Sequence, residues 1–165
     1  MELQKMFELQ RILDQRIEQE HGLTERDLFH DKMLALLVEI GELANETRCF
    51  KFWSEKGPAP KEVILEEFVD GVHFILSLGI VLGFDQNKPQ TQKRIQQNRN
   101  TLTEQFLDVF KQANALHTTR SEEDFWILFH GFFDLGTLLG FSQEEIFRAY
   151  LKKNEINHQR QDEGY

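Results

Sequence analysis

The chain has 165 residues, a length that fits one domain with its own hydrophobic core. Its formal net charge of −9 argues against a protein that binds nucleic-acid backbones, because such proteins show a basic face. The single cysteine, Cys49, excludes an intramolecular disulfide bond. The sequence has no signal-peptide pattern and no apolar run of membrane-spanning length, so we expect a single cytoplasmic domain over 1–165 without a membrane partner.

Apolar residues recur at helical spacing along most of the chain, and only three prolines interrupt it, which predicts an all-α fold. In chain order, helices are expected over about 2–20, from between 24 and 31 to 48, then 60–82, 101–117, 121–139 and 142–157. The polar stretch 85–100 is predicted to be a surface connector. We expect a bundle of about six helices with a four-helix core made of the second, third, fifth and sixth.

Several helix ends carry recognisable signals. Gly22 suits the end of the first helix, Pro60 suits the start of the third, and Ser142 with Glu145 forms a capping box. The segment 78–84, Leu-Gly-Ile-Val-Leu-Gly-Phe, recurs at 135–141 as Leu-Gly-Thr-Leu-Leu-Gly-Phe. This short repeat is compatible with a duplicated helix pair or with chance.

Two pairs of carboxylates stand out inside apolar helical runs. Glu39 and Glu42 lie three residues apart in the second predicted helix, and Glu67 and Asp70 do so in the third. Residues i and i+3 share a helix face. Burying such groups is costly unless a positive charge meets them, and neither segment offers a row of Lys or Arg. A single pair is usually a solvated face, but two pairs favour a Mg²⁺ site, because Mg²⁺ prefers oxygen ligands.

These residues also carry a family resemblance. Glu39-x-x-Glu42, followed after twenty-four residues by Glu67-x-x-Asp70, resembles the signature of the all-α nucleoside triphosphate pyrophosphatases (MazG-like). Residues 42–54 resemble the dimeric dUTPase branch of that group. The C-terminal run Lys-Asn-x-x-Asn-x-x-Arg-Gln-x-x-Gly-Tyr is similar to the phosphate-binding motif of the same branch. The resemblance therefore covers essentially the whole chain.

The resemblance implies a function and a set of site residues. It implies that a homodimer hydrolyses dUTP, and also dUDP, to dUMP with Mg²⁺ as cofactor, and that Glu39 is the general base. The metal ligands it implies are Glu39, Glu42, Glu67 and Asp70. The phosphate ligands are Lys153, Asn157, Arg160 and Tyr165, and the nucleoside contacts are Gln10, Asp14, Asn45, Lys51 and Trp53. Asp14 departs from the family pattern, which has Asn near this point.

Other interpretations stay open at this stage. Gln10 and Asp14 could be ordinary surface, Trp53 with its aromatic neighbours could pack a helix corner, and His73 fits a satisfied core histidine better than a partner of Asp70. A basic C-terminal turn could simply complement the helix dipole. The fifth predicted helix is rich in aromatic residues, which fits a dimer interface or burial on all sides: Phe125, Trp126, Phe129, Phe132 and Phe133.

Two alternative functions also remain. A related enzyme that clears dCTP or a modified nucleotide would share the metal site and differ only in the base pocket. A non-catalytic helical interaction module would lack Mg²⁺-dependent turnover altogether.

Overall fold

A computed structural model describes residues 2–87 and 101–165 of the chain. These residues form six helices, and the predicted all-α fold is confirmed. The helices are α1 (Leu3–Glu20), α2 (Phe29–Thr47), α3 (Lys61–Leu82), α4 (Leu102–Thr119), α5 (Glu122–Leu138) and α6 (Gln143–Asp162). The predicted connector over 85–100 lies outside the described residues from 88 onward. Among the described helices, none is long and apolar enough by itself to cross a membrane. Helices α5 and α6 reach the required length and apolar composition only when they are taken together, and they are bent by 108° relative to each other.

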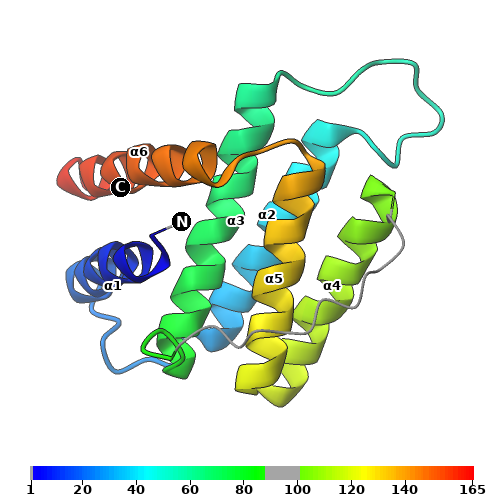
Figure 1. Cartoon of the computed structure of the whole chain (residues 1–165). Coiled ribbons are helices and arrows are strands. Elements are labelled where there is room, and N and C mark those ends of the chain that lie inside the picture. Colours follow the sequence, from blue (N-terminus) through cyan, green and yellow to red (C-terminus); the bar gives the residue numbers. More distant parts are fainter. Residues whose placement is uncertain (1, 88–100) are drawn as a thin grey trace.

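The four-helix core consists of α2, α3, α4 and α5, so the predicted membership was wrong (Figure 1). Helices α2 and α3 pack as one antiparallel pair, α4 and α5 as another, and α2 also contacts α4 while α3 contacts α5. Helix α6 lies outside this bundle, because its mean hydropathy is low and only four of its residues are buried. Such a helix has one narrow apolar face and covers a bundle rather than filling it.

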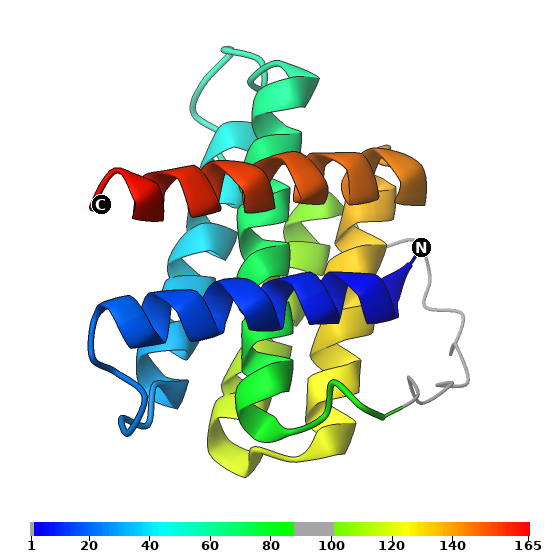
Figure 2. The same ribbon diagram turned by 90° about the vertical axis from the view of Figure 1, so that its left-hand side faces the viewer.

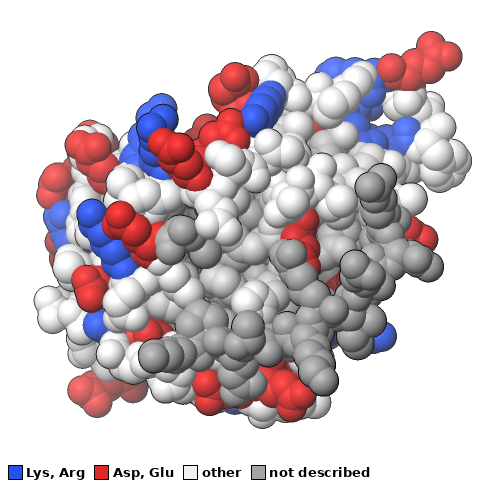
Figure 3. Space-filling view, viewed as in Figure 1, with Lys and Arg blue, Asp and Glu red and all other residues white. Residues whose placement is uncertain are grey.

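Helices α1 and α6 lie side by side across the bundle and pack on α3 (Figure 2). They run in the same direction, so their C-terminal ends lie next to each other beyond α3, on the side of α2. Acidic and basic side chains are interspersed over these two helices on the face shown in Figure 3. Helix α3, packed against α1, α2, α5 and α6, is therefore the most enclosed element of the fold.

Aromatic rings fill the space between α3 and α5. Phe68 stacks on Phe132 with ring centroids 4.6 Å apart, and each ring also packs against a glycine of the facing helix, Phe132 on Gly71 and Phe68 on Gly136. A methyl group added at Gly71 would lie 2.5 Å from the Phe132 ring. Four of the five aromatic residues noted in α5 are buried within the chain and Phe133 is partly buried, so burial on all sides explains them.

Local capping explains where the helices end. Ser142 and Glu145 form the predicted capping box at the start of α6. Helix α3 ends at Gly83, whose positive φ of 78° a side chain would strain, and the Phe84 amide donates to the Gly79 carbonyl. The repeated segment makes the same ending after α5, at Gly140. Shared C-terminal capping is therefore a sufficient reason for the repeat.

Candidate functional site

The predicted carboxylate pairs meet where α2 packs against α3. One carboxylate oxygen from each of Glu39, Glu67 and Asp70 lies within 4.8 Å of the others. Ligand oxygens about 2.0–2.1 Å from one Mg²⁺ lie at most about 4.2 Å apart, so small side-chain rotations bring these three into range. The donor set is all oxygen and fits a hard divalent ion. Glu42 lies outside this group of three and is exposed.

Burial, together with the crowding of negative charge, raises the pKa of all three carboxylates. Partial burial raises the pKa of Glu39 to about 7, and the charges of Asp70 and Glu42 add to the shift. Burial also raises the pKa of Glu67, again with added repulsion from Asp70 and Glu42. The pKa of Asp70 is raised by burial as well, although Lys153 opposes the shift. The cluster therefore has more negative charge than its surroundings neutralise, which favours a bound cation.

Among the described residues, Lys153 of α6 forms the ion pair with this cluster. The buried Lys153 places Nζ 2.8 Å from Asp70 Oδ2 and 3.2 Å from Glu66 Oε1. In the described part of the chain, neither Glu39 nor Glu67 has a Lys or Arg within ion-pair distance. The predicted shortage of basic partners within the two segments is thus relieved from α6, by an ion pair at Asp70 and by the Lys153 charge, which also opposes the rise in the pKa of Glu67.

A cavity of about 290 Å³ opens beside the cluster, between α1, α2, α3 and α6. It brings together predicted residues that lie far apart in the sequence, from the first helix to the last. Its polar lining includes Gln10, Asp14, Glu18, Lys32, Glu39, Asp70, His73, Ser77, Lys153, Asn157 and Arg160. One pocket therefore joins the acidic cluster, a basic wall from α6 and an amide from α1.

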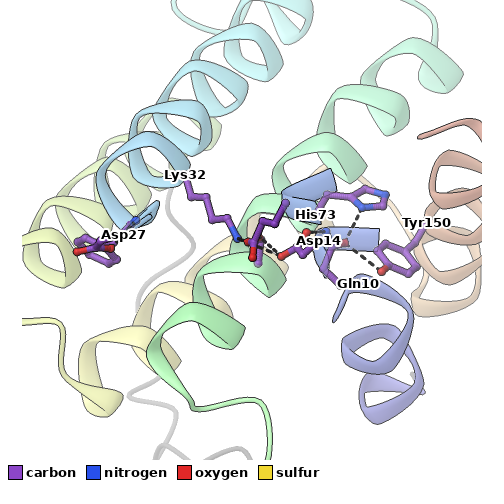
Figure 4. Close-up of polar contacts among 9 residues, drawn as sticks. Gln10, Asp14, Asp27, Lys32, His73 and Tyr150 are labelled. Atoms are coloured by element: carbon purple, nitrogen blue, oxygen red, sulfur yellow. Dashed lines mark hydrogen bonds and ion pairs between the residues drawn. The ribbon is translucent and has the colours of Figure 1, made fainter. Parts of the chain in front are cut away.

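Gln10 is the centre of a buried network at the inner end of this cavity (Figure 4). Its Oε1 accepts from Tyr150 Oη at 3.1 Å and from His73 Nδ1 at 2.7 Å, and its Nε2 donates to Asp14 Oδ1 at 2.8 Å. Burial, with the nearby Lys153 charge, lowers the pKa of His73 to about 3, so the ring is neutral. Its Nε2 is then a buried acceptor without a partner among the described residues. The sequence predicted a core histidine with its hydrogen bonds satisfied, but only Nδ1 of His73 has a partner.

Asp14 is buried and already accepts hydrogen bonds from three donors. Besides Gln10, the Ser77 hydroxyl and Lys32 Nζ donate to its carboxylate, the latter at 3.3 Å. Lys32 also donates to Glu18 Oε1 at 3.1 Å. The ordinary-surface interpretation is therefore wrong for both Gln10 and Asp14, which are 3% and 8% exposed.

Sequence reasoning missed three members of this network: Lys32, Ser77 and Tyr150. A helical face repeats every seven residues, and Lys32 precedes Glu39 by seven while Ser77 follows Asp70 by seven. Extending each carboxylate face by two turns would have found both residues.

The predicted phosphate ligands of the last helix lie near the mouth of the cavity. Asn157 and Arg160 line it, and Arg160 donates to Asn157 Oδ1 at 3.5 Å. The Arg160 guanidinium lies 5.4 Å from the centre of the Tyr165 ring, which is itself 79% exposed. Helix α6 continues to Asp162, five residues beyond the predicted end, so Lys153, Asn157 and Arg160 share one helical face.

The remaining predicted nucleoside contacts lie outside this cavity. Lys51 Nζ donates to Asn45 Oδ1 at 2.6 Å, and Asn45 lines a second hollow with Glu42 and Glu67. Trp53 is 64% exposed and meets Phe52 edge-on, with ring centroids 5.0 Å apart. Within the chain, Trp53 neither lines the cavity nor packs a buried corner.

Comparison with known proteins identifies the family. A family model described as dUTPase matches residues 2–165. No curated protein matches the chain. Members of this family use a divalent metal, in accord with the oxygen cluster formed by α2 and α3. The six-helix all-α fold and the match over nearly the entire length agree, and the chain therefore belongs to the all-α dimeric dUTPase family and is an enzyme, a dUTP diphosphatase.

Proposed function

We propose that the enzyme hydrolyses dUTP to dUMP and pyrophosphate in a Mg²⁺-dependent reaction, and that it also converts dUDP to dUMP and phosphate. The observation that carries this proposal is the acidic cluster of Glu39, Glu67 and Asp70 at the edge of the cavity that Gln10 and Lys153 also line. Carboxylates suit a divalent ion, basic and amide groups suit phosphate, and a buried amide suits a pyrimidine edge.

Glu39, Glu67 and Asp70 would hold Mg²⁺, with Glu42 one turn along α2 as a further ligand. When bound, Mg²⁺ supplies neutralisation of phosphate charge and polarisation of the phosphoryl group. The raised pKa of Glu39 suits a general base that accepts the proton of the attacking water. The pKa of the other two carboxylates is raised as well, so Glu39 is assigned on the size of its shift and on the family resemblance.

Residues of α6 would bind the phosphates. Lys153 is placed beside Asp70, and Asn157 and Arg160 follow it along the cavity wall. Arginine and lysine hold the phosphate oxygens that the metal leaves free. Tyr165, stacked near Arg160, would close over them.

The base would occupy the inner end of the cavity. Gln10 keeps an amide proton available there, and the neutral His73 offers Nε2 as an acceptor. Asp14, which already accepts from three donors, would hold Gln10 in place rather than contact the base. Asn45, Lys51 and Trp53 would reach the nucleotide from the side of the second hollow.

The functional unit is proposed to be a homodimer. The aromatic residues of α5 are used inside the chain, so the interface needs another surface. Leu34 and Val38 lie one turn apart on the outer face of α2 and are 64% and 50% exposed. Val38 borders the second hollow, so a partner seated here would lie near Glu42 and Asn45. Glu substitutions at Leu34 and Val38 should shift the protein to monomers in light scattering.

A nucleotide panel tests the proposed reaction. The enzyme should release pyrophosphate from dUTP far faster than from dCTP or dTTP, and only with Mg²⁺ present. Glu39→Gln should lower turnover by at least about a hundredfold, the contribution of a general base. Turnover that is unaffected by a chelator, or a preference for dCTP, would overturn the proposal.

A further inference from the structure

The end of α6 carries site residues but is poorly packed. The buried residues of α6 end at Asn154, whereas Asn157 and Arg160 lie in the following two turns. Helix α1 is similar, since its buried residues end at Asp14. Both ends project beyond α3 (Figure 2), so core packing does not fix the distance between these two walls of the cavity.

Arg16 joins the two projecting ends. Its Nη2 donates to Asp162 Oδ1 at 2.6 Å, and its Nη1 donates to the His158 carbonyl at 3.1 Å. Its Nε donates to Glu20 Oε1 at 2.8 Å, which orients the guanidinium from its own helix. An exposed ion pair alone contributes little to stability, but the rigid guanidinium here contacts three residues at once, two of them on α6, and the Arg16 side chain is 28% exposed.

We propose that Arg16 is a positioning residue, which holds the last two turns of α6 against α1 so that Asn157 and Arg160 face the nucleotide phosphates. This inference rests on the proposed phosphate role of Arg160. Arg16 itself is not among the residues that line the cavity, so it acts through α6. A second contact between the two ends, from His21 to Gln161 at 3.3 Å, is exposed and involves an uncharged amide, so it is not an ion pair.

The consequence should appear in phosphate binding and not in base binding. Arg16→Ala should raise KM for dUTP about tenfold, because a displacement of about 1 Å in a positioning group can cost up to ~100-fold. Affinity for deoxyuridine, which has no phosphates, should change less than about twofold. The matched control is Arg148→Ala, since Arg148 lies on the exposed side of α6 and pairs with Glu144 within that helix.

A double variant separates positioning from a direct contact. Because Arg16 is proposed to act through Arg160 as well as Asn157, Arg16→Ala should raise the KM of Arg160→Ala by clearly less than the roughly tenfold increase expected in the wild-type background. If the changes in KM caused by Arg16→Ala and Arg160→Ala simply multiply in the double variant, the inference is overturned. Hydrogen exchange at residues 157–165 should be faster in Arg16→Ala and unchanged in Arg148→Ala.

Asp162→Ala provides a second route, because it removes the charged partner of Arg16 on α6 and leaves α1 intact. It should raise KM for dUTP in the same direction as Arg16→Ala, and it keeps the test decisive if Arg16→Ala folds poorly. If Arg160→Ala leaves dUTP binding unchanged, the proposed phosphate role fails. If Arg160→Ala weakens binding and neither Arg16→Ala nor Asp162→Ala does, only the present inference fails.

Discussion

Magnesium binding should depend on pH because a proton competes for Glu39. Burial and neighbouring charges raise the pKa of Glu39 to about 7 in the metal-free protein. At about pH 6 roughly nine-tenths of this carboxyl is protonated, and at about pH 8 roughly one-tenth. A metal ligand must be deprotonated, so the affinity for Mg²⁺ should be about tenfold lower at the lower pH.

Isothermal titration calorimetry of Mg²⁺ into chelator-treated protein measures this directly. Titrations in two buffers with different ionisation heats should show release of roughly 0.9 proton per ion near pH 6 and roughly 0.1 near pH 8. Glu39→Gln has no titratable proton at this position, so the affinity of this variant for Mg²⁺ should vary less with pH. Equal Mg²⁺ affinity at both pH values, or an unchanged pH dependence in Glu39→Gln, would refute the reasoning.

Three further predictions concern stability and the Lys153 contact. Folding raises the pKa of Glu39 to about 7, so its contribution to stability is fully present below the unfolded value of 4.5 and is lost as the pH rises through about 7. The pKa of Glu67 is raised as well, so its contribution changes in the same direction. Metal-free protein should therefore have a lower Tm near pH 8 than near pH 6, and Mg²⁺ should remove the difference. Gly71→Ala should cost about 1–3 kcal/mol in denaturant unfolding, because its methyl group meets the Phe132 ring, and Phe132→Leu should restore part of the loss. Lys153→Met removes a cation that lowers the pKa of Asp70, so dUTP turnover should fall more near pH 6 than near pH 8. A pH profile of turnover that runs parallel to that of the wild-type enzyme would contradict this.

Local signals explain why the helices could be predicted well. Helical periodicity, the Ser142 capping box and the glycine endings all act within a few residues, and the structure places the corresponding boundaries within two residues. The exceptions are the start of α2, which the sequence left between 24 and 31, and the end of α6, where no glycine occurs between Gly140 and Gly164. A polar helix without an early stop signal simply continues.

The candidate site was partly predictable for the same reason. Glu39, Glu67 and Asp70 follow from spacing on two helices that are adjacent in sequence and antiparallel in space. Trp53 was less predictable, because its position depends on a loop with few buried contacts. The residues behind the site, such as Lys32, required knowing which helix faces which.

The amino-acid sequence by itself determined the helices, their ends and the two carboxylate faces, since each depends on neighbours within about two turns. Only the tertiary structure decided that α4 and not α6 completes the four-helix core, that Lys153 reaches Asp70, and that Tyr150 meets Gln10 across 140 positions. The physical reason is that these contacts depend on how whole helices dock. Docking is set by the summed burial of many side chains, and no local spacing records it.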